Sequence, residues 1–472
     1  MSRIDTDICV IGAGSGGLSV AAGAVQMGAR VVLVEAGDMG GDCLNTGCVP
    51  SKALIAAAAA AQAQRRGFRG VAAAKPQIDF AAVKDHVADV IAEIAPFDSQ
   101  ERFEDLGCTV IRAFARFTAP DTVQAGDSTI RARRFVIATG SRPFVPPIMG
   151  VETVPYLTNE TIFALRDRPD HLLVIGGGPI GMEMAQAHRR LGCAVTVIEG
   201  DRALGREDPE MAAPVLAALR DEGITIREGQ AVVRLSGGEG AVEVTLSDGS
   251  SIAGSHVLMA VGRKVALDGM GLEAAKIAFD RKGVTVDDRL RSTTNRRVFA
   301  VGDAAGGLQF THVAGYHAGI VVRQAVLGLP ARARRDHFPR ATYTDPELAQ
   351  IGLTEAEARA AHGDRLHVIR LDLSQNDRAV AQGRKAGLLK LMVVRGRAVG
   401  VSITGPQAGE LIGLWAMPIT KGLKLSVITG IVLPYPTLSE LSKRAAGAYF
   451  SPQLFGNPWV KRVVRLVQRL LP

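Results

Sequence analysis

The sequence has few cysteines and no long apolar run. Only 5 of its 472 residues are cysteine, which is too few for the disulfide frameworks of small secreted domains. No uninterrupted apolar stretch approaches the roughly 20 residues of a membrane-spanning helix. A strand-like run begins already at Asp7, so no secretory signal is expected. These absences predict a cytoplasmic protein without a disulfide scaffold.

The composition is that of a globular protein. Hydrophobic residues make up 47% of the chain and charged residues 22%, and the length fits roughly two to four domains. Much of the net charge of +8 falls in two basic clusters, residues 332–340 and 461–469. No nucleic-acid-binding motif accompanies them, so we expect no nucleic-acid partner and interpret the first cluster as a solvated linker.

The segment from Asp7 to Glu35 predicts a dinucleotide-binding unit, because an apolar strand, a glycine turn, a small-residue helix and a second strand follow one another. Gly12, Gly14 and Gly17 match G-x-G-x-x-G. The first glycine permits the turn, the second lets backbone approach a pyrophosphate, and the third lets helix and strand pack. Glu35 would accept hydrogen bonds from a ribose.

The same pattern recurs at residues 171–199, with Gly176, Gly178 and Gly181 in the turn and Glu199 at the end of the second strand. Two such units predict two bound dinucleotides. A flavin and a nicotinamide are the natural pair, because hydride must pass between two carriers.

Glu199 also bears on the choice of nicotinamide. A carboxylate at this position accepts a ribose 2′-hydroxyl and repels a 2′-phosphate. Arg202 and Arg206 follow closely and would weaken that preference. NADH is therefore the expected donor, with NADPH as the alternative.

Cys43 and Cys48 form the one close cysteine pair, and an Ala-rich helix is predicted to begin near Pro50 or Ser51. A helix N-terminus lowers the pKa of a nearby thiol, and Lys52 adds positive charge. Zinc binding is the rival interpretation, but no second pair with ligand spacing accompanies this one.

The other cysteines are interpreted as core residues: Cys9, Cys108 and Cys193. Cys9 and Cys193 lie beside the predicted strands. A reversible disulfide is therefore predicted for Cys43 and Cys48 alone.

The run GGDCLNTGCVPSKAL, residues 40–54, resembles the redox motif of the pyridine nucleotide–disulfide oxidoreductases, the family of lipoamide dehydrogenase, glutathione reductase and mercuric reductase. The resemblance covers nearly the whole chain. It continues, in family order, through Ala138–Pro143, the second glycine motif, Val261–Arg263, Val298–Asp303, Tyr343–Ala358 and Pro436–Glu440.

The resemblance implies an α/β fold with two Rossmann-like domains, for FAD and NAD(P), and an α+β C-terminal dimerisation domain. It also implies a homodimer whose active site is shared across the interface. The expected boundaries are 1–149 for the first part of the FAD domain, 150–262 for the NAD(P) domain, 263–335 for the second part of the FAD domain and 336–472 for the dimerisation domain.

The resemblance also implies roles for single residues. Asp303 matches the residue that hydrogen-bonds the flavin ribityl chain, and Lys52 and Glu183 match an ion pair beside the flavin ring. Cys48 would be the flavin-side thiol and Cys43 the interchange thiol that meets the acceptor.

Further cofactor-binding residues follow from the matching motifs. Arg263 is expected to touch the nicotinamide dinucleotide. The alternative interpretation is that its side chain forms a structural salt bridge. The other residues assigned to cofactor binding in this way are Gly41, Thr139, Gly140, Gly262 and Gly302.

One departure concerns the motif H-P-T-x-x-E, whose histidine shuttles protons for the interchange thiol in disulfide-reducing members. Here Tyr435 replaces the histidine, while Glu440 is retained. A tyrosine titrates near ~10 and is a poor base at neutral pH. His312 and His317 are the histidines that would have to substitute.

Mercuric reductases also carry tyrosine at the matching position, and residues 206–209 resemble them too. The chain has no cysteine after Cys193, so their C-terminal cysteine pair is absent. We predict an FAD-dependent NAD(P)H oxidoreductase that passes electrons through Cys43 and Cys48 to a metal ion or another non-standard acceptor. The alternatives are a dihydrolipoamide dehydrogenase-type enzyme, a membrane-associated NADH:quinone reductase and a slow redox sensor.

The C-terminal tail predicts a basic amphipathic helix preceded by Trp459. Its apolar residues are Val460, Val463, Val464, Val467, Leu470 and Leu471, and its basic residues are Lys461, Arg462, Arg465 and Arg469. This pattern is typical of an interfacial membrane anchor. The alternative is a helix docked on the dimer with its basic face in water.

Overall fold

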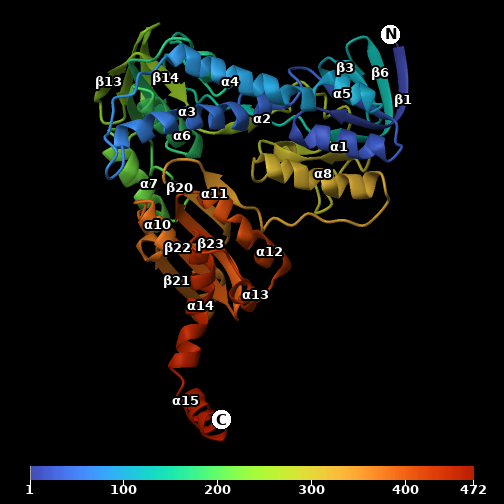
Figure 1. Ribbon diagram of the computed structural model, residues 1–472. Helices are drawn as coiled ribbons and strands as arrows, with labels where there is room; N and C mark the ends of the chain where they lie inside the picture. The colour runs from blue at the N-terminus through green and yellow to red at the C-terminus, as the bar shows by residue number, and fades with distance from the viewer. Residues whose placement is uncertain (1, 472) are drawn as a thin grey trace. The chain divides into compact units, whose positions relative to one another are not determined.

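The computed structural model describes residues 2–471. The chain forms two compact units that interleave along the sequence (Figure 1). The first unit holds the residues up to 176 together with 187–200 and 229–334. The second holds 177–186, 201–228 and the residues from 335 onward.

A seven-stranded sheet forms the centre of the first unit. Its β1, β2, β3, β6 and β18 run parallel, and β4 and β5 extend it as an antiparallel meander. In sheet order the strands are β3 (Thr109–Arg112), β2 (Val31–Glu35), β1 (Ser2–Ile11), β6 (Ser128–Ile137), β5 (Thr122–Ala125) and β4 (Ala115–Ala119), with β18 (Val298–Ala300) also paired to β6.

Small residues let two helices lie close together on this sheet. Figure 1 shows α1 (Ser15–Gln26) beside α8 (Thr311–Ala325). A β-carbon at Gly16 would lie 3.3 Å from Ala314 Cβ, and one at Gly23 would lie 3.1 Å from Val322 Cγ2. The glycine-rich stretch after the first turn thus has a packing role besides its role in the turn.

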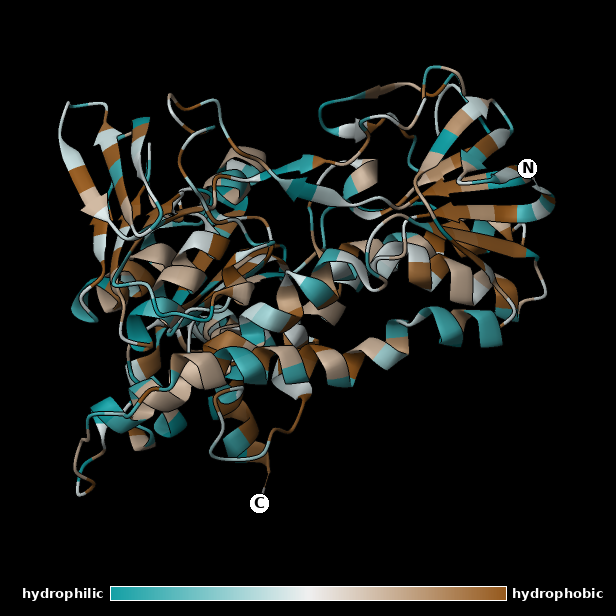
Figure 2. Cartoon of the chain, turned by 90° about the horizontal axis from the view of Figure 1, so that it is seen from above, coloured by the Kyte–Doolittle hydropathy of each residue, from teal (hydrophilic) through white to brown (hydrophobic). Residues whose placement is uncertain are grey.

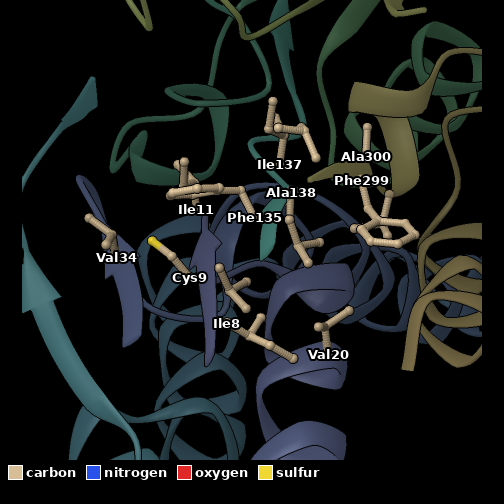
Figure 3. Packing of buried hydrophobic residues seen from close by; sticks show 14 of the residues in the cluster. Ile8, Cys9, Ile11, Val20, Val34, Phe135, Ile137, Ala138, Phe299 and Ala300 are labelled. Atoms are coloured by element: carbon tan, nitrogen blue, oxygen red, sulfur yellow. The ribbon is translucent and has the colours of Figure 1, made fainter. Parts of the chain in front are cut away.

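The core of the first unit is built from the parallel strands and α1. Ile8, Cys9 and Ile11 of β1 belong to the same buried cluster as Phe135 of β6 and Phe299 of β18 (Figure 3). The strands near the N-terminus carry long hydrophobic stretches (Figure 2). Such continuous apolar runs are expected of parallel strands covered on both faces.

Helices α2 (Gly41–Asn45) and α3 (Cys48–Arg66) carry the cysteine pair. The prediction that the Ala-rich helix begins near Pro50 or Ser51 was wrong by two or three residues, because α3 begins at Cys48. Proline is tolerated inside the first turn, where backbone N–H groups have no partner within the helix. The remaining helical segments of this region are α4 (Phe80–Ile94), η1 (Ala95–Asp98) and α5 (Gln100–Asp105).

The second glycine motif also lies in a β–α–β arrangement. Strand β8 (His171–Ile175) pairs in parallel with β9 (Ala194–Ile198) and with β14 (His256–Met259), and α6 (Pro179–Arg190) connects β8 to β9. Other elements between residues 141 and 284 are α7 (Pro209–Asp221), β10 (Thr225–Arg227) and the antiparallel strands β11 (Val232–Gly238), β12 (Ala241–Leu246) and β13 (Ser251–Gly254). Two-stranded ribbons are formed by β7 (Ser141–Pro143) with β15 (Arg263–Val265) and by β16 (Phe279–Asp280) with β17 (Gly283–Val284).

An antiparallel five-stranded sheet dominates the second unit, and Trp415 is fully buried against it, donating a 2.9 Å hydrogen bond from Nε1 to Ser442 Oγ. The strands in sheet order are β19 (Arg340–Thr342), β20 (Glu347–Gly352), β23 (Arg397–Gly405), β22 (Leu388–Val394) and β21 (Leu366–Asp372). The helices after residue 335 are α9 (Glu355–His362), α10 (Asp377–Ala381), α11 (Ala408–Leu411), α12 (Gly413–Lys421), α13 (Ser426–Gly430), α14 (Glu440–Phe455) and α15 (Pro458–Leu470).

The fold confirms the predicted α/β class with Rossmann-like units and an α+β C-terminal part. The four expected boundaries stay a prediction. Within residues 2–471, none of the helices combines the length and the hydrophobicity that crossing a membrane would require.

Candidate active site

The start of α2, which carries Cys43, lies directly on the first glycine turn. Gly40 N donates a 2.9 Å hydrogen bond to Ala13 O. Gly41 has a φ of +62°, and a β-carbon there would lie 2.8 Å from Gly14 Cα. Only glycine tolerates this approach. The residues predicted to bind the cofactor pyrophosphate and the redox pair are therefore brought together by backbone packing.

The two thiols interact with each other and with two hydroxyl groups. The structure describes both cysteines in the reduced form. Cys48 Sγ lies 3.6 Å from Thr311 Oγ1, at the start of α8, and Cys43 is hydrogen-bonded to Cys48 and to Ser15, at the start of α1. The pair is thus surrounded by the N-terminal ends of helices.

This arrangement separates the acidities of the two thiols. The hydrogen bond from Cys43, aided by Thr311 and by the charge of Lys52, lowers the pKa of Cys48 to about 6. The same hydrogen bond, together with burial, raises the pKa of Cys43. At neutral pH the pair therefore holds one thiolate, on Cys48, and one thiol, on Cys43. A thiolate is the form that attacks disulfides and binds soft metals.

The first glycine turn fits the pyrophosphate of FAD. Gly12 has a φ of +103°, and a β-carbon at Gly17 would lie 1.8 Å from Gly12 O. The Glu35 carboxylate accepts hydrogen bonds from Ala13 N (2.5 Å) and Gly37 N (2.6 Å). It braces the turn from the end of β2 and keeps acceptor capacity for a ribose.

Thr139 supplies a second observation that fits a bound cofactor. Its Oγ1 is buried and has no hydrogen-bond partner in the part of the chain that the structure describes. Buried hydroxyl groups are almost always hydrogen-bonded, so this one is poised to bond a ligand. Neighbouring Gly140 has a φ of +65° and no atoms within 4 Å of the place of a β-carbon, which leaves room beside it.

A chain of polar contacts runs from Asp303 to the residue before Cys43. Ser141 Oγ donates to Asp303 Oδ2 (2.5 Å), and Arg263 Nε donates to Ser141 Oγ (2.7 Å). Arg263 Nη2 then pairs with Asp42 Oδ2 at 3.2 Å. Burial raises the pKa of Asp303 despite the Ser141 hydrogen bond. For Arg263 the structure shows the salt bridge that was the alternative interpretation; a nicotinamide contact stays a prediction.

Asp42 is also fixed by Thr46 Oγ1 and Asn159 Nδ2, both of which donate to its Oδ1 at 2.9 Å. Its negative charge opposes ionisation of Cys48. We therefore expect Asp42→Asn to lower the pKa of Cys48 further, measured as thiolate absorbance against pH in the reduced protein. Asp38→Asn, at an exposed position just before α2, is the matched control. A higher pKa of Cys48 in Asp42→Asn would contradict the electrostatic role.

The second glycine turn repeats the geometry of the first. Gly12 N donates to Val34 O and Gly176 N to Ile198 O, both at 2.8 Å. A β-carbon at Gly12 would lie 2.4 Å from Ala138 O, and one at Gly176 would lie 2.4 Å from Ala260 O. The repeat seen in the sequence is therefore a repeat in three dimensions.

The remaining residues predicted to bind nicotinamide lie around this turn in the sequence. Gly178 precedes α6, Gly181 lies in its first turn and Glu199 follows β9. Gly178 and Gly262 have no atoms within 4 Å of the place of a β-carbon. The strand after Gly262 pairs with β7, so the two motifs at 138–143 and 261–263 are joined by a ribbon.

Other predicted residues have different surroundings. Glu183 Oε1 accepts a 2.9 Å hydrogen bond from Tyr343 N; its ion pair with Lys52 stays a prediction. His317 is buried, and its Nδ1 accepts a hydrogen bond from Gly302 N (3.2 Å). His312 stacks on Phe310. Neither histidine gains support as a substitute proton shuttle.

Tyr435 is exposed and bound to a carboxylate. Its hydroxyl donates a 2.8 Å hydrogen bond to Asp377 Oδ2, at the start of α10. This hydrogen bond, with the charges of Asp377 and Glu440, raises the pKa of Tyr435. Glu440 begins α14. The Tyr435 hydroxyl thus keeps its proton in a hydrogen bond. Its phenolate, the form that could act as a base, is less accessible than that of a free tyrosine.

The other three cysteines are buried, at 0% exposure for Cys9 and Cys193 and 6% for Cys108. Burial raises the pKa of Cys9 to about 12 and of Cys108 and Cys193 to about 11, so they are inert. No group of three or more His, Cys, Asp or Glu side chains with metal-binding geometry occurs among residues 2–471.

Four residues around the pair were not predicted from the sequence. Asp42, Ser15 and Ser141 all lie within the sequence motifs described above, so their positions were available signals. Thr311 lies 263 residues after Cys48, and no local pattern marks it.

Comparison with known proteins places the chain in a family. A model of the pyridine nucleotide-disulphide oxidoreductases matches residues 6–318, and a model of the dimerisation domain of the same family matches residues 338–446. The chain therefore belongs to the pyridine nucleotide–disulfide oxidoreductase family. It is an FAD-dependent NAD(P)H disulfide oxidoreductase, and the dimerisation domain supports a homodimer.

Two relatives have different names at equal identity. A mercuric reductase of Streptomyces lividans is 35% identical over 94% of this chain and 96% of its own length. A dihydrolipoyl dehydrogenase of Thermus scotoductus is 35% identical over 94% and 97%. The structure of a Cu(II) complex of RclA, the HOCl-induced flavoprotein disulfide reductase of Escherichia coli, matches with a TM-score of 0.85 and 29% identity over 94% of this chain and 99% of that one.

Proposed function

We propose that the enzyme uses NADH to reduce a soft metal ion, Hg(II) in the first instance, bound by Cys43 and Cys48. The observation that carries this proposal is the hydrogen bond that holds the Tyr435 hydroxyl and raises its pKa. Its hydroxyl is hydrogen-bonded to Asp377 and its pKa is raised, at the position where disulfide-reducing members have a histidine. Dithiol exchange requires a proton carrier there, and this chain has none at that position.

Reduction of a bound metal ion needs thiolate ligands but no proton carrier at position 435. Two thiolates form a soft donor set, which soft metal ions prefer. Cys48 is already a thiolate near neutral pH, while Cys43 loses its proton on binding the ion. The overall reaction balances as NADH plus Hg(II) giving NAD⁺, elemental mercury and one proton. FAD, held at the first glycine turn, would supply the two-electron chemistry that links NADH to the cysteine pair.

Different residues would bind the two cofactors and favour the thiolate. The glycine turn at 12–17 and Thr139 would hold FAD, and Lys52 would favour the anionic thiolate. Glu199 is assigned to the ribose 2′-hydroxyl of NADH. The relatives named mercuric reductase support a metal acceptor. The Escherichia coli protein, whose structure is a Cu(II) complex, also supports a metal ion as ligand.

The deciding experiment reduces the purified protein with NADH without oxygen and then offers acceptors one at a time. We expect Hg(II), kept soluble by a small thiol, to reoxidise the flavin faster than lipoamide, glutathione disulfide or a quinone. NADPH should replace NADH poorly in the same assay. Faster reoxidation by lipoamide would overturn the metal proposal in favour of a dihydrolipoamide dehydrogenase.

The variant Tyr435→His tests the proton argument. A histidine titrates near ~6.5 and can act as the missing base, so turnover with lipoamide should rise at least ~10-fold. The gain should follow the titration of an imidazole in a pH–rate profile. Tyr435→Phe is the matched control and should give no such gain. An unchanged or lower rate in Tyr435→His would show that the tyrosine does not limit disulfide chemistry.

A further inference from the structure

Helix α15 exposes an apolar face at the end of the chain. Figure 1 shows α14 leading away from the five-stranded sheet of the second unit, with α15 beyond its end. No residue of α15 is buried. The exposed large apolar residues of this region are Leu454, Phe455, Trp459, Val463, Val464, Leu466, Val467, Leu470 and Leu471.

The helix itself is specified locally. Asn457 Oδ1 accepts a 2.9 Å hydrogen bond from Trp459 N as the N-cap, and Pro458 occupies the first turn. These are strong start signals. Yet α15 has only 13 residues, and an isolated helix of this length is marginal in water. A surface that covers the apolar face would stabilise it.

The charges of the region are of one sign. No aspartate or glutamate follows Glu440, whereas six basic residues do: Lys443, Arg444, Lys461, Arg462, Arg465 and Arg469. At 3.6 residues per turn, Lys461, Arg465 and Arg469 align on one side of α15. Trp459, Val463 and Leu470 align on the other. A partner that covers α15 must therefore offer an apolar region for one side of the helix and negative charge for the other.

The family's dimerisation domain does not account for this surface. Its match ends at residue 446, before α15 begins at Pro458. A nucleic acid would contact the basic side and leave the apolar side in water. A bilayer with anionic lipids satisfies both, because the apolar side enters the acyl region while Lys and Arg remain among the headgroups.

We propose that α15 binds the enzyme peripherally to the surface of an anionic bilayer. Apolar residues on one side of the helix insert, and the basic side contacts negatively charged headgroups. The positive tail complements the negative charge of such lipids. This complementarity favours an anionic bilayer over a neutral membrane and over a second copy of the chain, which is positive in the same region.

The test uses the full-length FAD-loaded protein in vesicle flotation. It should bind vesicles of phosphatidylcholine with phosphatidylglycerol at least ~10-fold better than vesicles of phosphatidylcholine alone, and salt should weaken binding. Arg465→Glu/Arg469→Glu should lower binding to the anionic vesicles at least ~10-fold. Val463→Ser/Val467→Ser, which leaves the charge unchanged, should also lower it.

The control Arg69→Glu/Arg335→Glu reverses two other exposed charges and should bind like the unaltered protein. Reduction of bound FAD by NADH should be the same in all variants, which keeps this test separate from that of the acceptor. Equal binding to neutral and anionic vesicles, or no binding, would overturn the proposal. A dissociated dimer in the α15 variants, seen by sedimentation, would assign the face to a second copy instead.

Discussion

Cys43→Ala is expected to lower turnover with any external acceptor by ~10³-fold or more, since it removes a group that takes part in the covalent or ligand chemistry. Reduction of bound FAD by NADH should continue, because that step precedes the cysteine pair. Stopped-flow measurement of flavin reduction and of acceptor-dependent reoxidation separates the two steps.

The same variant should change the acidity of Cys48. The hydrogen bond from Cys43 is the largest cause of the lowered pKa of Cys48, and its loss leaves burial, which favours the neutral thiol. The pKa of Cys48 should rise from about 6 toward its ordinary value, so the thiolate absorbance should appear at higher pH. The thiolate fraction at pH 7 then falls.

Cys108→Ala is the matched control, since Cys108 is buried in the core of the first unit. It should leave acceptor turnover and the titration of Cys48 unchanged. Wild-type turnover in Cys43→Ala would mean that electrons leave the flavin without passing through the pair, as in a direct quinone reductase.

Gly17→Ala is expected to weaken FAD binding at least ~100-fold, equivalent to about 3 kcal/mol. A β-carbon at this position would lie 1.8 Å from Gly12 O and 3.3 Å from Ala138 Cβ. Backbone must therefore move, and the turn predicted to receive the pyrophosphate opens. The flavin content of the purified protein and its fluorescence on dilution measure the loss.

Gly319→Ala provides the comparison, since Gly319 lies in α8 with no atoms within 4 Å of the place of a β-carbon. It should keep its FAD, and alanine suits a helix interior better than glycine. If Gly17→Ala retained FAD as well as Gly319→Ala does, the first glycine turn would not be the pyrophosphate site.

The sequence by itself determined the two glycine turns and the cysteine pair. Both depend on local conformation. A glycine turn needs a positive φ and close packing at fixed spacings, and Gly12 and Gly176 show these in the structure. The β–α–β periodicity around each turn is also local. Motif order along the chain then identified the family.

Helix boundaries were less certain from the sequence, as α3 shows. Pro50 suggested a start near itself, but proline fits the whole first turn equally well. The start at Cys48 places the thiol inside the helix N-terminus and closer to its positive end. The prediction of a lowered pKa was correct in direction, and the hydrogen bond from Cys43 proved the largest contribution.

Only the tertiary structure decided what surrounds the cysteine pair. Thr311 approaches Cys48 because α8 packs on α1, and Arg263 approaches Asp42 because β15 pairs with β7. The hydrogen bond of Tyr435 to Asp377 likewise joins residues 58 positions apart. Such contacts follow from sheet register and helix packing, which a local pattern does not encode. The sequence alone therefore determined the cysteine pair and the replacement of the motif histidine by Tyr435. The fold determined the acidity of each thiol and the hydrogen bond that holds the Tyr435 hydroxyl.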